Sequence, residues 1–217
     1  MRDDNQHLFF VLCTLTSATL WIVGSSFFNT GWVTATIIAF GVFFLIVFYI
    51  ANSGDPFLVR LLVVSLMAGW TGVCSDWWLV HSSKTLVYYP GGPFVGRTPL
   101  YVSFGLTCAL FLLGYLASFF STRMRRLPAC LLTGLVGTGS LFLYEHCAEG
   151  AGWWYYQNTG MIGNTPYHAI VANFLTAVSL PLLAQRVETA SLSGTLGLGT
   201  LLGLWFCVAT ALPASLF

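Results

Sequence analysis

Long apolar segments alternate with short polar breaks along the whole chain. An apolar segment of about 20 residues is long enough to cross ~30 Å of hydrocarbon as a helix. The pattern therefore predicts an all-α membrane protein with seven transmembrane helices. Their expected ranges are about 8–28, 32–51, 58–80, 99–121, 128–147, 166–185 and 192–216.

The breaks carry residues that are typical of turns and helix ends. Asn29–Gly31 predicts a tight turn, Asn52–Pro56 a turn followed by a helix start, and Arg123–Pro128 a charged connection. Pro99 and Pro166 are expected in the first turn of their helices, where a missing N–H is tolerated, each after a threonine that could cap the helix. These signals support the division into seven segments.

Composition agrees with the pattern. The chain is 57% hydrophobic and 7% charged, against roughly 25% charged residues in a soluble domain. Its mean hydropathy is +0.80. We therefore expect an integral protein of the lipid bilayer. The net charge of +1 gives no reason to expect nucleic acid or a polyanionic substrate as a partner.

The basic residues predict an orientation. Two of them, Lys84 and Arg97, fall on the side of the odd-numbered loops. The other six fall on the side of the N-terminus and the even-numbered loops: Arg2, Arg60, Arg123, Arg125, Arg126 and Arg186. Because cytoplasmic loops carry the excess of Lys and Arg, we expect a cytoplasmic N-terminus and a C-terminus on the opposite face.

Two loops share one pattern. Tyr88–Pro99 and Tyr155–Pro166 each start with two tyrosines and, six residues later, continue with Gly, any residue, Thr and Pro. A fixed offset of this kind predicts an internal repeat. Copy A would be helices three and four, about 58–121, and copy B helices five and six, about 128–185. Both loops enter from the non-cytoplasmic side, so the copies would be parallel repeats about an axis along the membrane normal.

These loops are rich in aromatic residues and nearly free of charge. One interpretation is an aromatic belt at the membrane interface, which needs no further function. The other is a lid over an apolar cavity, since non-helical backbone at membrane depth must be covered by protein or line a cavity. The paired helices with matching loops favour the lid.

Acids are scarce near the predicted helices. Asp76 lies near the outer end of the third helix, Glu145 near the outer end of the fifth, and Glu149 one turn after Glu145. A charge at the bilayer centre costs about 2.5–3.5 kcal/mol on insertion scales. Small residues at helical spacing behind Asp76 and Glu145 allow close helix packing. We therefore expect these two to face the bundle interior, with an interfacial position in water as the alternative; for Glu149 both positions are equally open.

The combination of acids and aromatic residues suggests a chemistry. A carboxylic acid in an apolar pocket holds its proton strongly and can protonate an alkene or epoxide. Aromatic faces stabilise the resulting carbocation. This is what carbocation chemistry on an isoprenoid needs, although interface anchoring alone could account for the aromatic residues. The expected substrate-binding residues are Trp77, Trp78, Tyr89, Tyr101, Trp153, Trp154, Tyr156, Tyr167 and Asn173.

Two histidines near these acids, His146 and His168, are expected to orient the carboxyl groups or to shuttle protons. A metal site made from them with Glu145 and Glu149 is conceivable, but no H-x-x-H or H-x-x-x-H pair supports it. We therefore expect no metal and no cofactor.

The motifs resemble a known family. An acid near a helix end is followed by Gly-x-Trp-x-Tyr, then Gly, then a proline that opens the next helix, in tandem copies within a seven-helix protein. This arrangement resembles the membrane-integral lycopene cyclases and the carotenoid hydratases, over about residues 70–180. The matching residues are Glu145, Gly152, Trp154, Tyr156, Gly160 and Pro166 and, more faintly, Asp76, Val87, Tyr89 and Pro99.

The resemblance implies a membrane enzyme that protonates a polyene or terpenoid and guides the cation to cyclise, add water or lose a proton. Lycopene cyclases carry paired glutamates just after the helix-opening proline, where this chain has Leu100–Val102 and Tyr167–Ala169. Acid chemistry would therefore rest on Asp76 and Glu145. A shorter terpenoid or a prenylated aromatic compound fits as well as lycopene.

The sequence thus predicts a cofactor-independent terpene cyclase with an apolar isoprenoid substrate. Asp76 and Glu145 would be proton donor and partner, and Glu149, His146 and His168 would assist them. A hydratase or double-bond isomerase with the same site is one alternative. A non-catalytic protein that binds a lipid or sterol is the other.

Overall fold

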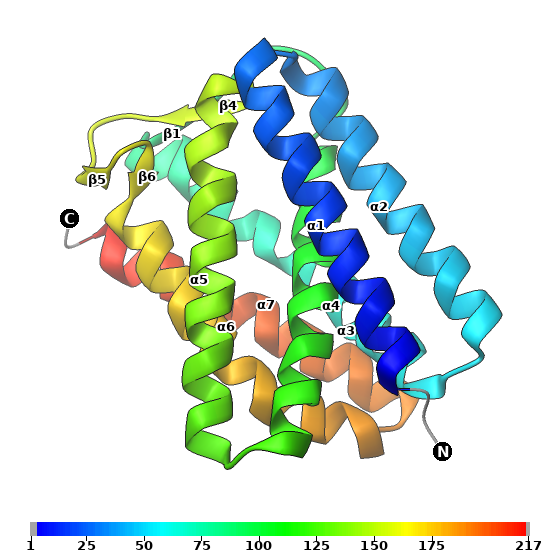
Figure 1. The fold of residues 1–217 in the computed structure, drawn as a ribbon. Coiled ribbons are helices and arrows are strands. Elements are labelled where there is room, and N and C mark those ends of the chain that lie inside the picture. Colours follow the sequence, from blue (N-terminus) through cyan, green and yellow to red (C-terminus); the bar gives the residue numbers. More distant parts are fainter. Residues whose placement is uncertain (1–3, 216–217) are drawn as a thin grey trace.

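The computed structural model describes residues 4–215, a bundle of long helices with short strands at one end (Figure 1). Within these residues, seven helices are long and apolar enough to cross a membrane, as the sequence predicted. Arg2 and residue 216, the expected end of the last helix, lie outside the described residues. The helices are α1 (Asp4–Phe28), α2 (Gly31–Ser53), α3 (Pro56–Trp78), α4 (Leu100–Arg123), α5 (Arg126–Gly150), α6 (Tyr167–Thr189) and α7 (Leu192–Ala214).

Two of the predicted turns form as expected. The α1–α2 turn places Asn29 and Gly31 in the left-handed region, with φ of 47° and 71°. At the start of α3, Asp55 is the N-cap, and its side chain accepts a 2.8 Å hydrogen bond from the Phe57 amide. Pro56 follows as the first helical residue, where its missing N–H leaves no bond unmade.

The prediction for the other two prolines is wrong by one residue. Pro99 and Pro166 stand before α4 and α6 as N-cap residues with extended backbone, and neither helix start has a side-chain cap. Thr98 and Thr165 lie in short strands instead, so they do not cap these helices. A proline disfavours helical backbone at the residue before it, which suits an extended Thr.

The two aromatic loops, residues 84–99 and 151–166, contain six short strands that an all-α prediction misses. β1 (Leu86–Tyr88) pairs antiparallel with β4 (Trp154–Tyr156), with Val87 opposite Tyr155. Two small hairpins follow, β2 (Phe94–Val95) with β3 (Thr98–Pro99), and β5 (Met161–Ile162) with β6 (Thr165–Pro166). The β1–β4 ladder joins the two loops directly, so their strands lie side by side at the end of the bundle (Figure 1).

The strands keep the register of the predicted repeat in the two hairpins and shift it by one residue between β1 and β4. The last residue of β1 is Tyr88 and the last residue of β4 is Tyr156, whereas the sequence pattern aligned Tyr156 with Tyr89. A π-helical turn, η1 (Leu79–Ser83), extends α3 and precedes β1. The internal repeat itself stays a prediction.

Glycines bring α7 close to α3. A Cβ at Gly199 would lie 2.5 Å from the Val64 carbonyl oxygen and 2.7 Å from Met67 Cβ. A Cβ at Gly203 would be as crowded against Thr71 and Ala68, whereas Gly197 has open space around it. The α3–α7 contact therefore depends on two missing side chains on one face of α7.

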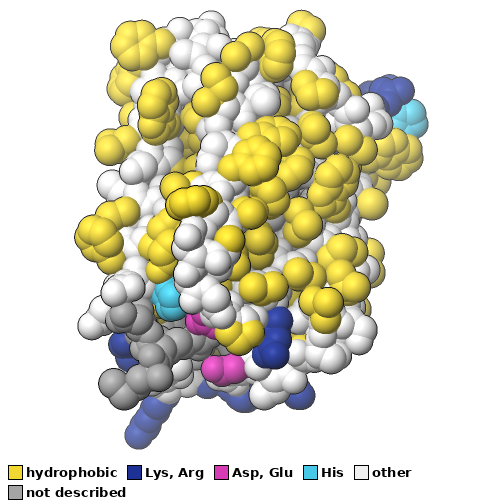
Figure 2. All heavy atoms as spheres, turned by 90° about the vertical axis from the view of Figure 1, so that its right-hand side faces the viewer, with side chains coloured by type: hydrophobic (Ala, Val, Ile, Leu, Met, Phe, Trp, Pro, Cys, Tyr) yellow, Lys and Arg dark blue, Asp and Glu magenta, His cyan; other side chains and the backbone are white. Residues whose placement is uncertain are grey.

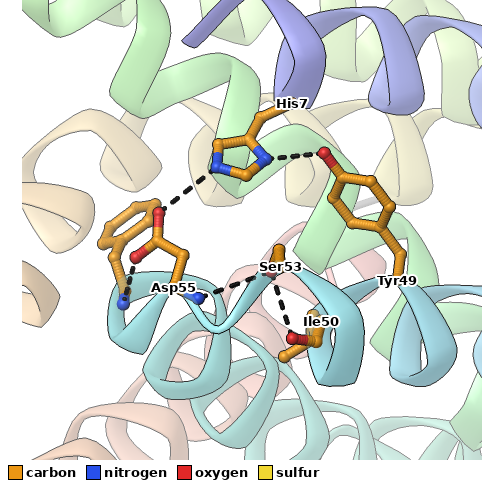
Figure 3. A network of polar contacts seen from close by, with 6 residues as sticks. His7, Tyr49, Ile50, Ser53 and Asp55 are labelled. Atoms are coloured by element: carbon orange, nitrogen blue, oxygen red, sulfur yellow. Dashed lines mark hydrogen bonds and ion pairs between the residues drawn. The ribbon is translucent and has the colours of Figure 1, made fainter. Parts of the chain in front are cut away.

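The end of the bundle that holds the N-terminus is fastened by a polar network (Figure 3). His7 of α1 has Nδ1 2.6 Å from Tyr49 Oη and Nε2 3.5 Å from Asp55 Oδ2. Phe10 stacks on Tyr49 with 3.7 Å between ring centroids. The network ties α1 to the α2–α3 turn. Figure 2 shows most of the Lys and Arg side chains of its face at this lower end, below a surface rich in hydrophobic side chains.

Candidate functional site

A cavity of about 180 Å³ lies inside the bundle, below the strand end. Every one of the seven helices, together with β1, β4 and Trp153, contributes lining residues from within the described part of the chain. The walls are mostly aliphatic. Among the polar groups that reach the cavity, the two carboxyl groups, Asp76 and Glu145, are the only ones that can carry a negative charge at neutral pH.

Asp76 reaches the cavity from the last turn of α3. Its Oδ2 accepts a 2.7 Å hydrogen bond from the hydroxyl of Tyr88, the last residue of β1. Gly72 and Gly69, one and two turns earlier, also line the cavity. Because these glycines carry no side chain, α4 packs closely against this face of α3: a Cβ at Gly69 would lie 2.7 Å from the Ser103 carbonyl oxygen.

Glu145 reaches the cavity from α5. Its Oε2 accepts two 3.0 Å hydrogen bonds, one from the Trp154 indole N–H and one from the Tyr156 hydroxyl. Both donors come from β4, which returns over the end of α5. Gly152 makes this return possible with a left-handed φ of 70°. The expectation that Asp76 and Glu145 both face the interior is therefore confirmed.

The two acids have one kind of donor in common. Each carboxyl group accepts a hydrogen bond from the tyrosine that ends the strand after its own helix. Burial, and then the neighbouring carboxyl groups, raise the pKa of Tyr88 and of Tyr156 well above the usual value. Both hydroxyls therefore keep their protons and act as donors at neutral pH. Since β1 pairs with β4, the ladder also fixes the two acid–tyrosine pairs relative to each other.

Aromatic side chains form the wall next to Glu145. Trp153 and Trp154 line the cavity and are buried, with 1% and 4% of their surface exposed. Tyr101 lies behind them, where its ring stacks on Trp154 and its hydroxyl donates to the Trp153 carbonyl at 3.4 Å. The Trp153 indole N–H donates to the Gly31 carbonyl at 3.0 Å, which attaches the α1–α2 turn to this wall.

The cavity contains six of the residues predicted from the sequence, and Tyr101 supports the wall from behind. Asn173 is one of the six and is buried, with 5% of its surface exposed. The lining residues that were predicted are Asp76, Glu145, Trp153, Trp154, Tyr156 and Asn173.

Glu149 and His146 are exposed and do not line the cavity. The helix continues past Glu145 as expected, but each turn rises about 5.4 Å, so Glu149 lies beyond the end of the cavity. His146 follows Glu145 by one residue and turns away to stack on Phe142. The prediction that Glu149 and His146 lie at the cavity, where they could assist the acids, is therefore wrong.

Four predicted aromatic residues also lie outside the cavity. Trp77 is 48% exposed and stacks on His81, since it follows the inward-facing Asp76 by about 100° around the helix. Tyr89 is 38% exposed because it follows Tyr88, and successive residues of extended backbone face opposite sides. Trp78 packs against the buried cluster that includes Tyr101 and Trp153, but it does not line the cavity. Tyr167 is 40% exposed.

His168 is fully buried but lies behind Tyr156, outside the cavity. The two rings make an edge contact with 5.8 Å between centroids, and His168 Nδ1 lies 3.5 Å from Thr159 Oγ1. Its Nε2 has no hydrogen-bond partner among residues 4–215. His168 therefore supports the tyrosine that holds Glu145 and does not touch the carboxyl group.

Of the three tyrosines that line the cavity, the predicted site residues included Tyr156 but not Tyr88 or Tyr144. Strand alternation contained a signal for Tyr88, because either Tyr88 or Tyr89, but not both, can face the interior. Tyr144 packs its ring against Trp153 and Trp154. Within the described part of the chain, no three His, Cys, Asp or Glu side chains come together as a metal site would require.

The family model described as a domain of unknown function (DUF6989) matches residues 73–217, more than half of the chain. The chain belongs to this family. No curated protein and no solved structure matches it. Asp76, Glu145 and the three side chains that donate to them all lie within the matched segment, whereas α1 and α2 lie outside it.

Proposed function

We propose that the protein is a membrane-embedded terpene cyclase that starts a carbocation reaction by protonating an apolar isoprenoid. One observation carries the proposal: two carboxyl groups, each held by a tyrosine hydroxyl, share the wall of a mostly apolar cavity. A mostly apolar pocket with a few convergent polar groups is the usual form of a binding or active site.

The proposed reaction balances without a cofactor. One carboxylic acid transfers its proton to a double bond or epoxide, and the substrate becomes a carbocation that closes a ring by using the electrons of a second double bond. Loss of a proton from carbon to a carboxylate ends the reaction and restores the acid. The tyrosine donors stabilise the carboxylate that forms, and the faces of Trp154 and Tyr144 stabilise the cation.

The size of the cavity bears on the substrate. Its volume of about 180 Å³ is close to the ~150 Å³ of an engineered apolar cavity that binds benzene. A short terpenoid, or one end of a longer chain, fits this space better than a whole carotenoid does. This agrees with the departure from the lycopene cyclases after Pro99 and Pro166.

The proposal includes the predicted repeat and orientation. Copies A and B would each supply one acid, one aromatic strand and one donor tyrosine. The strand end would face away from the cytoplasm. The matched pairs Asp76–Tyr88 and Glu145–Tyr156 support the repeat, and the basic residues at the N-terminal end support the orientation.

Isosteric neutral variants test the proposal. Asp76→Asn and Glu145→Gln should abolish product formation in cells that accumulate isoprenoids, while the purified proteins remain monodisperse in detergent. Glu149→Gln is the matched control, because this acid is exposed and lies outside the cavity, and it should keep full activity. Full activity of both cavity variants would refute the acid mechanism.

A hydratase is the second candidate. Ser140 and Asn173 line the cavity and form no side-chain hydrogen bond with any described residue, so they could hold a water molecule. A product heavier than the substrate by one water would assign hydration, whereas an unchanged mass would assign cyclisation or isomerisation. A protein that only binds a lipid would form no product and would keep its ligand in both neutral variants.

A further inference from the structure

A second hollow lies on the other side of Tyr88 from the cavity. It is open to the outside at the strand end, and it shares the side chains of Leu86 and Tyr88 with the cavity lining. Tyr88, the side chain that donates to Asp76, therefore also borders this open hollow. We call this hollow the basic vestibule, and its lining residues are Val80, Lys84, Leu86, Val87, Tyr88, Phe94, Arg97 and Gln157.

The charge of the vestibule is unusual for this protein. Of the eight Lys and Arg residues in the chain, Lys84 and Arg97 are the only two between Arg60 and Arg123, and both line this one hollow. Both are exposed. Within residues 4–215, neither side chain forms an ion pair or a hydrogen bond. Lys84 and Arg97 thus line the same hollow, and neither is neutralised by an anion from the described residues.

The backbone does not explain a lysine at position 84. Lys84 has a left-handed φ of 55°, a conformation that Gly or Asn adopts at lower cost. Hydrogen bonds fix the position: the Gln157 side-chain amide donates to the Lys84 carbonyl at 3.2 Å, and the Gln157 backbone N–H donates to the Thr85 carbonyl at 2.9 Å. The Lys84 side chain therefore lines the vestibule from an anchored loop.

We propose that the basic vestibule binds the single phosphate or carboxylate head group of the isoprenoid whose hydrocarbon chain occupies the cavity. This inference rests on the proposed function and names the substrate class. Arg97 would bind the anion through its planar guanidinium group and Lys84 as a point charge. The cavity itself is mostly apolar and would take the hydrocarbon end.

An anionic head group is compatible with the proposed chemistry. The reaction begins with protonation of a double bond or epoxide, so the head group does not leave. It anchors one end of the substrate and thereby fixes which carbon lies beside the acids. The net charge of +1 does not reveal this local excess, because seven acids offset the eight basic residues over the whole chain.

Paired ligands with the same tail test the assignment. The full chain in phosphatidylcholine nanodiscs would be titrated with farnesyl phosphate, farnesol and inorganic phosphate, and binding would be followed by the fluorescence of the cavity tryptophans. Wild type should bind farnesyl phosphate at least about tenfold more tightly than farnesol. Lys84→Gln and Arg97→Gln should each reduce the affinity for farnesyl phosphate about tenfold and leave the affinity for farnesol unchanged.

Two controls sharpen the test. Lys84→Arg should retain the preference for the phosphorylated ligand, and Arg125→Gln, at the opposite end of the bundle, should not change it. Equal affinity of wild type for both ligands, or a preference that survives in the double Gln variant, would overturn the proposal. Loss of the preference in nanodiscs that contain phosphatidylglycerol would assign the vestibule to a membrane lipid and would also overturn it.

The outcome is independent of the acid mechanism. Asp76→Asn and Glu145→Gln should still bind farnesyl phosphate with the same preference over farnesol. Unchanged turnover in those variants would refute the proposed cyclase mechanism. The binding results test only the proposal that the vestibule binds the head group.

Discussion

The hydroxyl of Tyr88 lies 2.7 Å from Oδ2 of Asp76 and is the one side-chain donor that this carboxyl group has among the described residues. Glu145 is held differently, because both Tyr156 and Trp154 donate to its Oε2. The two tyrosines therefore occupy matching places with unequal support. Removing one hydroxyl should leave Asp76 without a donor, but should leave Glu145 with one.

Tyr88→Phe should reduce turnover about 10²- to 10³-fold, the usual effect of losing one donor to a charge that develops during reaction. Tyr156→Phe should cost only about tenfold, because the Trp154 N–H still reaches Glu145. Initial rates of product formation measure both effects. Tyr89→Phe is the control, since Tyr89 is exposed, and its rate should match wild type. Equal losses in the first two variants would contradict the asymmetry.

Stability should depend on pH through the two donor tyrosines. Their pKa values are raised above the usual ~10 by burial, so the folded protein keeps protons that the unfolded chain loses. The free energy of unfolding is unaffected by these groups below about pH 10, and above it falls by about 1.4 kcal/mol per pH unit for each tyrosine. Unfolding in detergent at a series of pH values should show a shallower alkaline decline for the Tyr88→Phe, Tyr156→Phe double variant. The same slope in both proteins would show that neither hydroxyl is perturbed.

Two glycines of α7 should respond oppositely to one methyl group. Gly199→Ala places a Cβ against Val64 and Met67 of α3 and should destabilise the protein by about 1–3 kcal/mol. Gly197→Ala meets no atom within 4 Å and should stabilise the helix by up to about 1 kcal/mol. Melting temperatures in detergent separate the two. A loss in both variants would mean that α7 is disrupted by the substitution and not by contact with α3.

The polar network of Figure 3 should separate into two contributions. Asp55→Ala removes both the cap of α3 and the contact with His7, and should cost about 1–2 kcal/mol. Asp55→Asn keeps a side-chain oxygen for the Phe57 amide and removes only the charge, so it should cost less. Thermal unfolding of wild type and both variants measures the two parts: the loss from wild type to Asn is the contribution of the His7–Asp55 pair, and the further loss from Asn to Ala is that of the cap. An Asn variant as unstable as the Ala variant would assign the whole effect to the charge.

Much of the helical architecture could be predicted from the sequence, because hydrocarbon thickness fixes the length of an apolar segment. The inward position of Asp76 and Glu145 could also be predicted, since an acid in a membrane helix needs an interior surface. The features that the helical pattern did not predict depend on contacts between segments that are distant in the sequence. Whether Tyr88 or Tyr89 faces the cavity depends on the β1–β4 ladder, and a ladder between distant loops leaves no periodic signal in strands of three residues.

The wrong predictions for Glu149 and Trp77 have a similar explanation. The helical pattern predicts which face of α5 carries Glu149, but not how far along the helix axis the cavity extends. An interior and a surface position were therefore equally compatible with the sequence. Depth depends on where the cavity ends, and that is set by the strands that cross above α5. The exposed position of Trp77 followed from the inward position of Asp76 by helix geometry alone, so that error was avoidable.

The α1–α2 hairpin lines one side of the cavity with Leu15, Ala18, Thr19, Ile22, Ala35, Ile38, Ala39 and Val42, all outside the segment that the family model matches. The two carboxyl groups and this part of the cavity wall thus belong to separate stretches of the chain. The carboxyl groups can remain unchanged while two helices are exchanged or remodelled around them. Under the proposed function, a change of hydrocarbon substrate would therefore require changes in α1 and α2 and none in the two carboxyl groups.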